Sequence, residues 1–368
     1  MAIGFWGSFL DNGPYKSVVD RKTDMIVQLL KSPGQRKHWD DYVSQARDAT
    51  HYHQVGWKDV IERSFGHRAC YWMAQDERGE IQGVFPLIHL RSLFFGSFMV
   101  SLPYFNYGGV CATNSAARKV LVDAAIGWAQ KQRAEHIEMR HDTITHDIDL
   151  PFKNSKVSMR LDLPSEGELW TSFNAKLRSQ IRRPMKDGLV GRVGREEELD
   201  AFYKVFSRNM RDLGTPVYSK SFFRNILQTF SENVWIVTVY NKNIPVASGV
   251  LIGFRDTLEI PWASSLREYN SLSPNMLLYW TALRFACDRG FRVFDFGRST
   301  PGSGTYRFKE QWGARPISLY WYYWMRSGGQ LPDLSPSHPK YRLAIQVWKR
   351  LPVSFTRLIG PPIVKNLP

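Results

Sequence analysis

The apolar positions along this chain follow two periodicities that alternate from one end to the other. Residues 115–133 carry an apolar side chain at every third or fourth position, which predicts an amphipathic helix. Residues 68–90 and 234–254 instead carry short apolar and aromatic runs on either side of a polar turn, which predicts pairs of adjacent strands. Because helices and paired strands follow one another in both halves, we expect an α/β protein with mixed sheets flanked by helices.

This order of elements occurs twice. Each half contains helices, a strand–turn–strand with a Gly-Val pair (Gly83-Val84 and Gly249-Val250), a further strand, a helix and two more strands. A repeat of this length indicates a duplicated domain rather than a solenoid unit. Residues 156–163 are expected to be the last strand of the first half, and Pro164–Gly167 the junction. We therefore expect an N-terminal extension (1–35), a first domain (36–164), a second domain (165–330) and a C-terminal loop and helix (331–368).

The stretch from Asp288 to Trp324 stands out within this pattern. Phe291–Phe296 predicts a strand, Gly297–Tyr306 is too polar for a core and too rich in glycine for a helix, and Ile317–Trp324 predicts the next strand. In α/β proteins the loops that follow strands commonly carry the chemistry. The alternative is a plain connection between two core strands, which would have no need for Arg298, Arg307 and Lys309.

The charge of the chain indicates the kind of partner. Its 368 residues include 49 Lys and Arg against 34 Asp and Glu, which gives a net charge of +15. This excess favours an anionic partner such as nucleic acid, anionic lipid or a phosphate-bearing substrate. The hydrophobic content of 43% is enough for packed cores and excludes a disordered chain.

Missing patterns exclude several functional classes. The three cysteines lie far apart and the nine histidines show no ligand spacing, so we expect reduced thiols and no metal. The absence of a Gly-x-Ser-x-Gly motif argues against a serine hydrolase. The sequence shows neither a signal peptide nor an apolar stretch long enough to span a bilayer, so we expect a cytoplasmic protein.

Two segments of the sequence resemble the FemAB family. One is DFGRS followed by GSGTYRFKEQWGA within residues 295–314, and the other is GVFPLIHLRSLFFGSFMVSLPYFNYGGV in residues 83–110. The resemblance covers about residues 36–365, and it is strongest to the FemAB-related proteins that accompany exosortase/PEP-CTERM and exopolysaccharide systems. It implies two tandem GNAT-like (acyl-CoA N-acyltransferase-like) domains.

The resemblance also implies an amide-forming acyltransferase. An aminoacyl group from aminoacyl-tRNA, or an acyl group from acyl-CoA, would pass to an amine of a cell-envelope (peptidoglycan) or exopolysaccharide precursor, with no bound cofactor. Contact with a membrane surface fits these partners, and we expect no DNA. The alternative is an inactive GNAT-like module that binds an anionic glycan precursor or RNA. Residues 111–120 and 267–276 lack the Arg/Gln-x-x-Gly-x-Gly/Ala pattern of ordinary acetyl-CoA enzymes, which disfavours ordinary CoA use.

Lys309 and Asp295 are the expected catalytic residues. Phe308-Lys309 matches a Phe-Lys pair that lies beside the donor ester in the FemAB family, and a fixed ammonium would stabilise the negative charge that develops during acyl transfer. The alternative is a solvated surface lysine. Asp295 would orient the amine or act as a base, or else hold the loop by accepting backbone N–H groups. Arg298 would bind a phosphate or carboxylate, or else pair with Asp295.

The donor is expected to contact two further groups. Ser303 and Tyr306 lie in the glycine-rich segment, which would form a lid, and Phe308 accompanies Lys309. Arg178 and Arg182 lie one helical turn apart in a strongly basic segment, where they would contact phosphates. A solvated basic face is the alternative for these two arginines.

The acceptor is expected to contact the first domain. Tyr104, Asn106 and Tyr107 lie in the PYFNYGG segment that the resemblance covers. They would line the acceptor groove. The alternative is that they pack at the end of a strand before a Gly-Gly turn.

Overall fold

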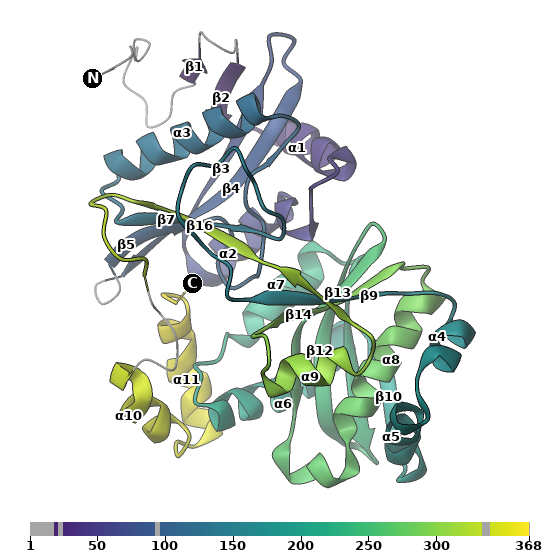
Figure 1. Cartoon of the computed structure of the whole chain (residues 1–368). Helices are drawn as coiled ribbons and strands as arrows, with labels where there is room; N and C mark the ends of the chain where they lie inside the picture. Colours follow the sequence, from purple (N-terminus) through teal and green to yellow (C-terminus); the bar gives the residue numbers. More distant parts are fainter. Residues whose placement is uncertain (1–17, 21–24, 93–95, 333–338, 368) are drawn as a thin grey trace. The chain divides into compact units, whose positions relative to one another are not determined.

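The computed structural model describes residues 18–20, 25–92, 96–332 and 339–367. It divides into two compact units, each with its own sheet, which are described separately (Figure 1). The first unit comprises Met1–Asn154, Leu319–Leu331 and Asn366–Pro368. The second unit comprises Ser155–Ser318 and Pro332–Lys365.

A mixed sheet forms the centre of the first unit. Its strands are β1 (Val18–Asp20), β2 (Met25–Leu29), β3 (Arg68–Gln75), β4 (Ile81–Ser92), β5 (Gly96–Val100), β6 (Cys111–Ala112), β7 (His136–His141), β8 (Phe152–Lys153) and β16 (Tyr320–Met325). They run in the order β1-β2-β3-β4-β5-β7-β16-β8, and β6 pairs with β4. Most neighbours are antiparallel, whereas β5 and β7 are parallel.

Helices cover both faces of this first sheet. They are α1 (Pro33–Gln45), η1 (His51–His53), α2 (Gly56–Phe65) and α3 (Ser115–Lys131). Helix α3 packs Leu121 into a core that contains Phe85 of β4. Trp39 of α1 stacks on Tyr71, which alternates in β3 with residues of that core and therefore faces the opposite side.

A second mixed sheet forms the centre of the second unit. Its strands are β9 (Val157–Asp162), β10 (Leu189–Gly194), β11 (Val234–Asn241), β12 (Ile244–Phe254), β13 (Thr257–Ser265), β14 (Val293–Ser299) and β15 (Arg315–Ser318). They run in the order β10-β11-β12-β13-β14-β9-β15, and β13 and β14 are parallel. The second sheet therefore repeats the parallel pair of the first.

Helices also cover both faces of the second sheet. They are α4 (Glu166–Ser172), α5 (Ala175–Lys186), η2 (Glu196–Glu198), α6 (Leu199–Leu213), α7 (Lys220–Thr229), η3 (Arg267–Leu272), α8 (Pro274–Asp288), α9 (Gly304–Glu310), α10 (Pro339–Trp348) and α11 (Val353–Val364). Helix α8 shares a core with Phe294 and Phe296 of β14. Helices α6 and α7 cover the other face, and α10 and α11 follow at the end of the chain (Figure 1).

The two units exchange strands relative to the expected domains. We expected residues 156–163 to close the first sheet, but β9 pairs with β14 and β15 in the second. We expected residues 317–324 to form one strand of the second domain, but the chain leaves the second sheet after β15 and enters the first with β16. The residue ranges of the units therefore differ from 36–164 and 165–330, because periodicity identifies a strand but not the sheet that it joins.

The segment after Phe296 also differs from expectation. Strand β14 continues to Ser299, and α9 occupies Gly304–Glu310, where we expected a glycine-rich loop. The Ser303 side chain accepts a hydrogen bond from the Tyr306 amide at 3.2 Å, and this cap stabilises the start of α9 despite the glycine content. At the C-terminus two helices, α10 and α11, replace the single helix that we expected.

Candidate active site

The parallel pair β13 and β14 brings polar side chains together in the second unit. Its register runs from Thr257 opposite Val293 to Glu259 opposite Asp295 and ends there. Helix α8 connects the two strands and begins beyond the end of β13. The residues that follow Asp295 thus occupy the position at which open α/β sheets commonly bind ligands.

A β-bulge in β14 shapes this position. Asp295 lies opposite Arg160 of β9, but Arg298 lies opposite Ser158, so β14 contains one residue more than its partner. Gly297 takes a φ of 74°, a conformation that glycine adopts without steric cost. The bulge therefore depends on a glycine between Phe296 and Arg298.

The buried Asp295 carboxylate holds the bulge in place. Its Oδ1 accepts hydrogen bonds from the Gly297 amide at 2.7 Å and from the Ser158 hydroxyl at 2.5 Å. Its Oδ2 accepts from Arg160 Nε at 2.9 Å, which forms an ion pair. Of the two roles considered for Asp295, these contacts favour the one in which it holds the backbone.

Lys309 reaches the same bulge from α9. It is buried, and its Nζ donates hydrogen bonds to the backbone oxygens of Gly297 and Arg298, each at 2.9 Å. Burial lowers the pKa of Lys309 to about 8, against the opposing influence of the Asp295 and Glu259 carboxylates. Lys309 is therefore not a solvated surface lysine.

Further cationic residues surround the end of β14. Arg298 is exposed, and Lys156 donates a hydrogen bond from Nζ to Thr300 Oγ1 at 2.7 Å. Burial, and then the charge of Arg298, lower the pKa of Lys156. Arg315 of β15 lies opposite Arg160 in the register. Like charges on neighbouring strands repel one another, so this cluster favours an anionic ligand.

The three other expected residues near Lys309 have packing or capping contacts. Ser303 caps α9 through the hydrogen bond described above. Tyr306 and Phe308 are partly buried against the core of the second unit, and the Phe308 ring lies 5.1 Å from that of Tyr279. These contacts fix α9, and thereby Lys309, against the sheet.

The expected phosphate-binding arginines lie on α5, and the chain itself contacts both. Arg178 donates hydrogen bonds to the backbone oxygens of Thr171 and Phe173, at the end of α4. The Arg182 guanidinium lies 5.0 Å from the centre of the Trp170 ring and is exposed on its other sides. Arg182 thus presents charge to solvent, whereas Arg178 mainly closes a helix end.

The expected acceptor residues belong to the first unit. Tyr104 has a φ of 75°, and its hydroxyl lies 3.0 Å from His67 Nε2. The Asn106 backbone oxygen accepts a hydrogen bond from Trp321 Nε1 at 3.1 Å. The Tyr107 ring is buried against other aromatic rings. These three residues therefore have structural contacts within their own unit.

Sequence reasoning missed the partners of Asp295. Ser158 and Arg160 come from β9, more than 130 positions earlier in the chain, and β9 was assigned to the other domain. The available signal was the alternation of Ser158 and Arg160 with apolar residues, which places both on one face of a strand. Glu259, which faces Asp295 in the register, was missed for the same reason.

The described residues include neither a candidate metal site nor a membrane-spanning helix. Those residues contain no group of three or more His, Cys, Asp or Glu side chains that could hold a metal ion. None of the helices in this part of the chain is both long and apolar enough to cross a membrane.

Comparisons with known proteins agree on the fold. Residues 171–310 match a family model described as an acetyltransferase (GNAT) domain. The crystal structure of FemX superposes with a TM-score of 0.61 and 17% identity, covering 87% of this chain and 100% of its own. The C-terminal domain of an Agrobacterium fabrum protein described as a lysylphosphatidylglycerol synthetase gives a TM-score of 0.53 and 13% identity, covering 78% and 91%.

A third solved structure has the same architecture. A tandem GNAT protein from the clavulanic acid biosynthesis pathway superposes with a TM-score of 0.52 and 11% identity, covering 83% of this chain and 100% of its own. No curated protein matches the sequence. The chain is thus an α/β protein of two tandem GNAT-like domains, and the second of them contains the segment that matches the GNAT acetyltransferase model.

Proposed function

We propose that this chain is a FemAB-like N-acyltransferase. It transfers an aminoacyl or acyl group to an amine of a cell-envelope or exopolysaccharide precursor. One observation carries the proposal: Lys309 is buried at the bulge of β14, within the segment that matches an acetyltransferase domain. Burying an ammonium costs free energy, and a function of the charge would explain why the protein bears that cost. Stabilising negative charge during acyl transfer is such a function.

The proposed reaction replaces an ester or thioester by an amide. The acceptor nitrogen attacks the donor carbonyl carbon, a C–N bond forms, and the C–O or C–S bond to the leaving group breaks. The nitrogen loses a proton, and the leaving oxygen or sulfur gains one. Negative charge develops on the carbonyl oxygen between these steps. An ammonium has three N–H donors, and Lys309 uses two of them on backbone oxygens, which leaves the third for the reacting group.

Asp295 acts in this proposal as a positioning residue. Its carboxylate fixes the Gly297 amide, and the Gly297 backbone oxygen in turn accepts a hydrogen bond from Lys309. The carboxylate thus controls where the ammonium lies, without needing to contact the substrate. Arg298, which is exposed at the end of the same strand, binds the phosphate or carboxylate of the donor.

Both candidate donors are anionic, as the cations around β14 require. The resemblance of the sequence to the FemAB family fits an aminoacyl-tRNA donor, and Arg182 on α5 would contact its phosphates. The match to an acetyltransferase domain fits an acyl-CoA donor. Ser273, at the start of α8, makes no side-chain cap, and this 15-residue helix could therefore bind a pyrophosphate at its N-terminus. Both donors occur in the cytoplasm, and the reaction is placed there.

A direct comparison of donors tests this function. Purified protein is incubated with an extract of envelope and polysaccharide precursors and with either labelled aminoacyl-tRNA or labelled acyl-CoA. We expect label in an amide that is stable to mild alkali from one donor. The same incubation with Lys309→Met measures the background. Absence of alkali-stable label with both donors, under conditions in which the protein is folded, would contradict an acyltransferase and favour a binding module.

A further inference from the structure

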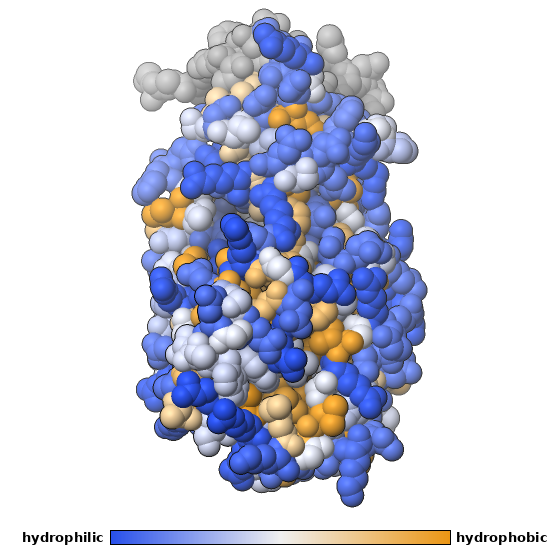
Figure 2. Space-filling model, turned by 90° about the vertical axis from the view of Figure 1, so that its right-hand side faces the viewer, coloured by the Kyte–Doolittle hydropathy of each residue, from blue (hydrophilic) through white to orange (hydrophobic). Residues whose placement is uncertain are grey.

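The two C-terminal helices of the second unit expose apolar side chains. Leu343 and Leu358 are each 72% exposed, more than any other large hydrophobic residue among those that the structure describes. Val347 on α10 and Phe355 on α11 are also exposed. On the face shown in Figure 2, by contrast, apolar residues form small groups between hydrophilic ones. Four exposed apolar side chains on two consecutive helices are therefore unusual for this chain.

The exposed apolar residues lie opposite the faces that the helices bury. In α11 the buried residues Thr356, Gly360 and Val364 repeat every four positions and form one face. Phe355 and Leu358 lie about half a turn away from that face at 100° per residue. In α10, Trp348 is buried, whereas Leu343 and Val347 lie one turn apart on the outer side. Each helix thus has an outward apolar stripe.

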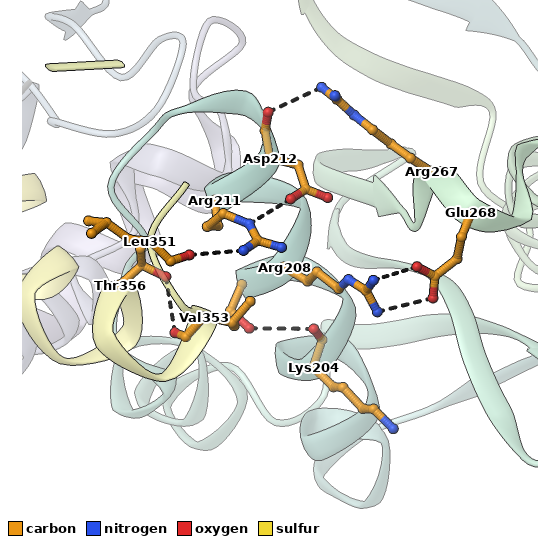
Figure 3. A network of polar contacts seen from close by, with 10 residues as sticks. Lys204, Arg208, Arg211, Asp212, Arg267, Glu268, Leu351, Val353 and Thr356 are labelled. Carbon is orange, nitrogen blue, oxygen red and sulfur yellow. Dashed lines mark hydrogen bonds and ion pairs between the residues drawn. The ribbon is translucent and has the colours of Figure 1, made fainter. Parts of the chain in front are cut away.

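Specific contacts hold both helices on α6. Arg211 of α6 donates a hydrogen bond to the Leu351 backbone oxygen at 2.9 Å, in the connection between α10 and α11 (Figure 3). Arg357 Nε donates to the Ser207 hydroxyl at 2.8 Å. Ile345 lies so close to Gly214 that a Cβ there would come within 2.5 Å of it. The outward stripes therefore belong to helices that are already docked on the second unit.

The charge around the two stripes is of one sign. Asp333 is the last acidic residue of the sequence, and six lysines and arginines follow it. Arg342 on α10 and Arg350 directly after it are exposed, whereas the Lys349 stem lies against Gly214 at the end of α6. Asp212, at the end of α6, forms an ion pair with Arg211 (Figure 3). The surface is therefore apolar in the middle and basic at its edge.

We propose that α10 and α11 form a docking surface for an anionic membrane. A helix with an apolar face and lysines or arginines beside it lies in the headgroup region of a bilayer, with the apolar face buried. Helices of 10 and 12 residues are too short to span a bilayer, so they would rest on it. The positive charge at the edge of the surface is complementary to anionic lipid headgroups, which favours a membrane as the occupant.

Vesicle binding tests the surface without requiring any donor or acceptor. The 368-residue protein is centrifuged with vesicles of phosphatidylcholine alone and with vesicles containing about one third phosphatidylglycerol. We expect binding to the anionic vesicles that weakens with added salt. Leu343→Gln with Leu358→Gln should lower the partition coefficient at least about tenfold, because two apolar side chains are lost from the bilayer. Lys349→Gln with Arg350→Gln should lower it about tenfold on anionic vesicles only.

Matched variants distinguish binding through this surface from non-specific hydrophobic binding to vesicles. Val190→Gln with Ile244→Gln replaces two apolar side chains of the same unit, 52% and 45% exposed, and should leave vesicle binding unchanged. Thermal unfolding of each variant confirms that it is folded. Equal binding by all variants, or no binding to anionic vesicles, would overturn the proposal. So would a wild-type dimer in light scattering that the leucine variant dissociates without any vesicle binding, because the surface would then join two copies of the chain.

Discussion

The parallel strand pairs of the two units have similar positions in their sheets but differ in charge: the charges beside the first pair are balanced, whereas positive charge is in excess beside the second. In the first unit, Arg140 of β7 is buried, forms an ion pair with Glu138, and donates a hydrogen bond to the Phe105 backbone oxygen at 2.6 Å. Tyr323 donates to the other oxygen of Glu138, and the Trp321 ring lies 4.3 Å from the Arg140 guanidinium. In the second unit, Arg298 at the end of β14 is exposed, and Lys309 lies at the bulge beside it.

This difference indicates that the first strand pair stabilises its own unit, whereas the second can bind an anionic ligand. The Glu138–Arg140 pair uses its charges on the chain itself, so no charge is left for a ligand. The Asp295 carboxylate instead holds a backbone bulge, and the cations around it outnumber the nearby carboxylates. We therefore assign the proposed chemistry to the second unit. The predictions that follow would break or sharpen this assignment.

Arg140→Met should have the largest effect, on the stability of the first unit. It leaves the Glu138 carboxylate buried without its cation, which typically costs about 3–5 kcal/mol. Hydrogen exchange at the amides of β7 and β16 measures this loss locally. Adding Glu138→Gln should restore part of it, because the uncompensated charge is removed.

The matched change in the second unit sharpens the comparison. Arg160→Met removes the partner of Asp295, but the Arg160 side chain is 26% exposed, whereas that of Arg140 is 3% exposed. Solvent therefore screens more of the Arg160 pair, and the loss of stability should be smaller. A larger loss for Arg160 than for Arg140 would reverse the assignment of the two strand pairs.

Lys309→Met should lower the rate of transfer by about two to three powers of ten, or about 3–4 kcal/mol. The methionine retains much of the alkyl stem but not the charge. Single-turnover transfer, compared with wild type, measures the effect. Arginine at this position should restore the rate only in part, because its planar group places the charge differently. A near-normal rate for Lys309→Met would exclude the proposed role.

The pH dependence distinguishes the charged from the neutral form of Lys309. With a pKa of about 8, the ammonium predominates below pH 8, so a rate that depends on it should fall as the pH rises through 8. Stability should change in the opposite direction. The folded-state pKa lies below the ordinary value of 10.5, so the folded protein binds this proton more weakly, and stability gains between about pH 8 and 10.5. The melting temperature of wild type should therefore rise relative to that of Lys309→Met across this pH range. A transfer rate that increases as the pH rises through 8 would instead indicate that Lys309 acts as a base.

Gly297→Ala should destabilise the protein less than Arg140→Met or Arg160→Met. The expected cost is about 1–2 kcal/mol, because alanine is strained at a φ of 74°. Its effect on transfer should nevertheless be clear, because the bulge carries both backbone oxygens that hold Lys309. Gly290→Ala is the matched control: its φ is 77°, no atom lies within 4 Å of the added Cβ, and it ends α8 outside the site. Equal loss of transfer in both variants would mean that the bulge has no special role.

Local patterns in the sequence predicted most of the individual elements. Helix α3 and the strand pairs β3–β4 and β11–β12 occur where the two periodicities of the sequence predicted a helix and paired strands. Both signals act over a few neighbouring residues, within reach of local sequence. The duplicated α/β architecture could be read for the same reason, because the order of elements repeats.

Long-range pairing could not be predicted in the same way. The Asp295–Arg160 contact joins residues 135 positions apart, and nothing in either segment specifies the other. A family motif identified Lys309 as a candidate, but its burial depends on the position of α9. That helix begins in a glycine-rich segment, where the Ser303 side chain caps its first turn. Arg178 shows the converse: its spacing suggested a phosphate contact, and the structure gives it two backbone oxygens at the end of α4.

The exchange of β9 and β16 has a consequence for how this protein is made. The first sheet includes a strand from residues 320–325, so during synthesis β7 has an open edge until residue 325 has left the ribosome. Open strand edges are prone to pair with other chains. A fragment that ends near residue 164 would keep that edge open permanently, and it would also carry β9 without its partners. Because no single cut separates the two units, attempts to express two halves should supply both of them in the same cell.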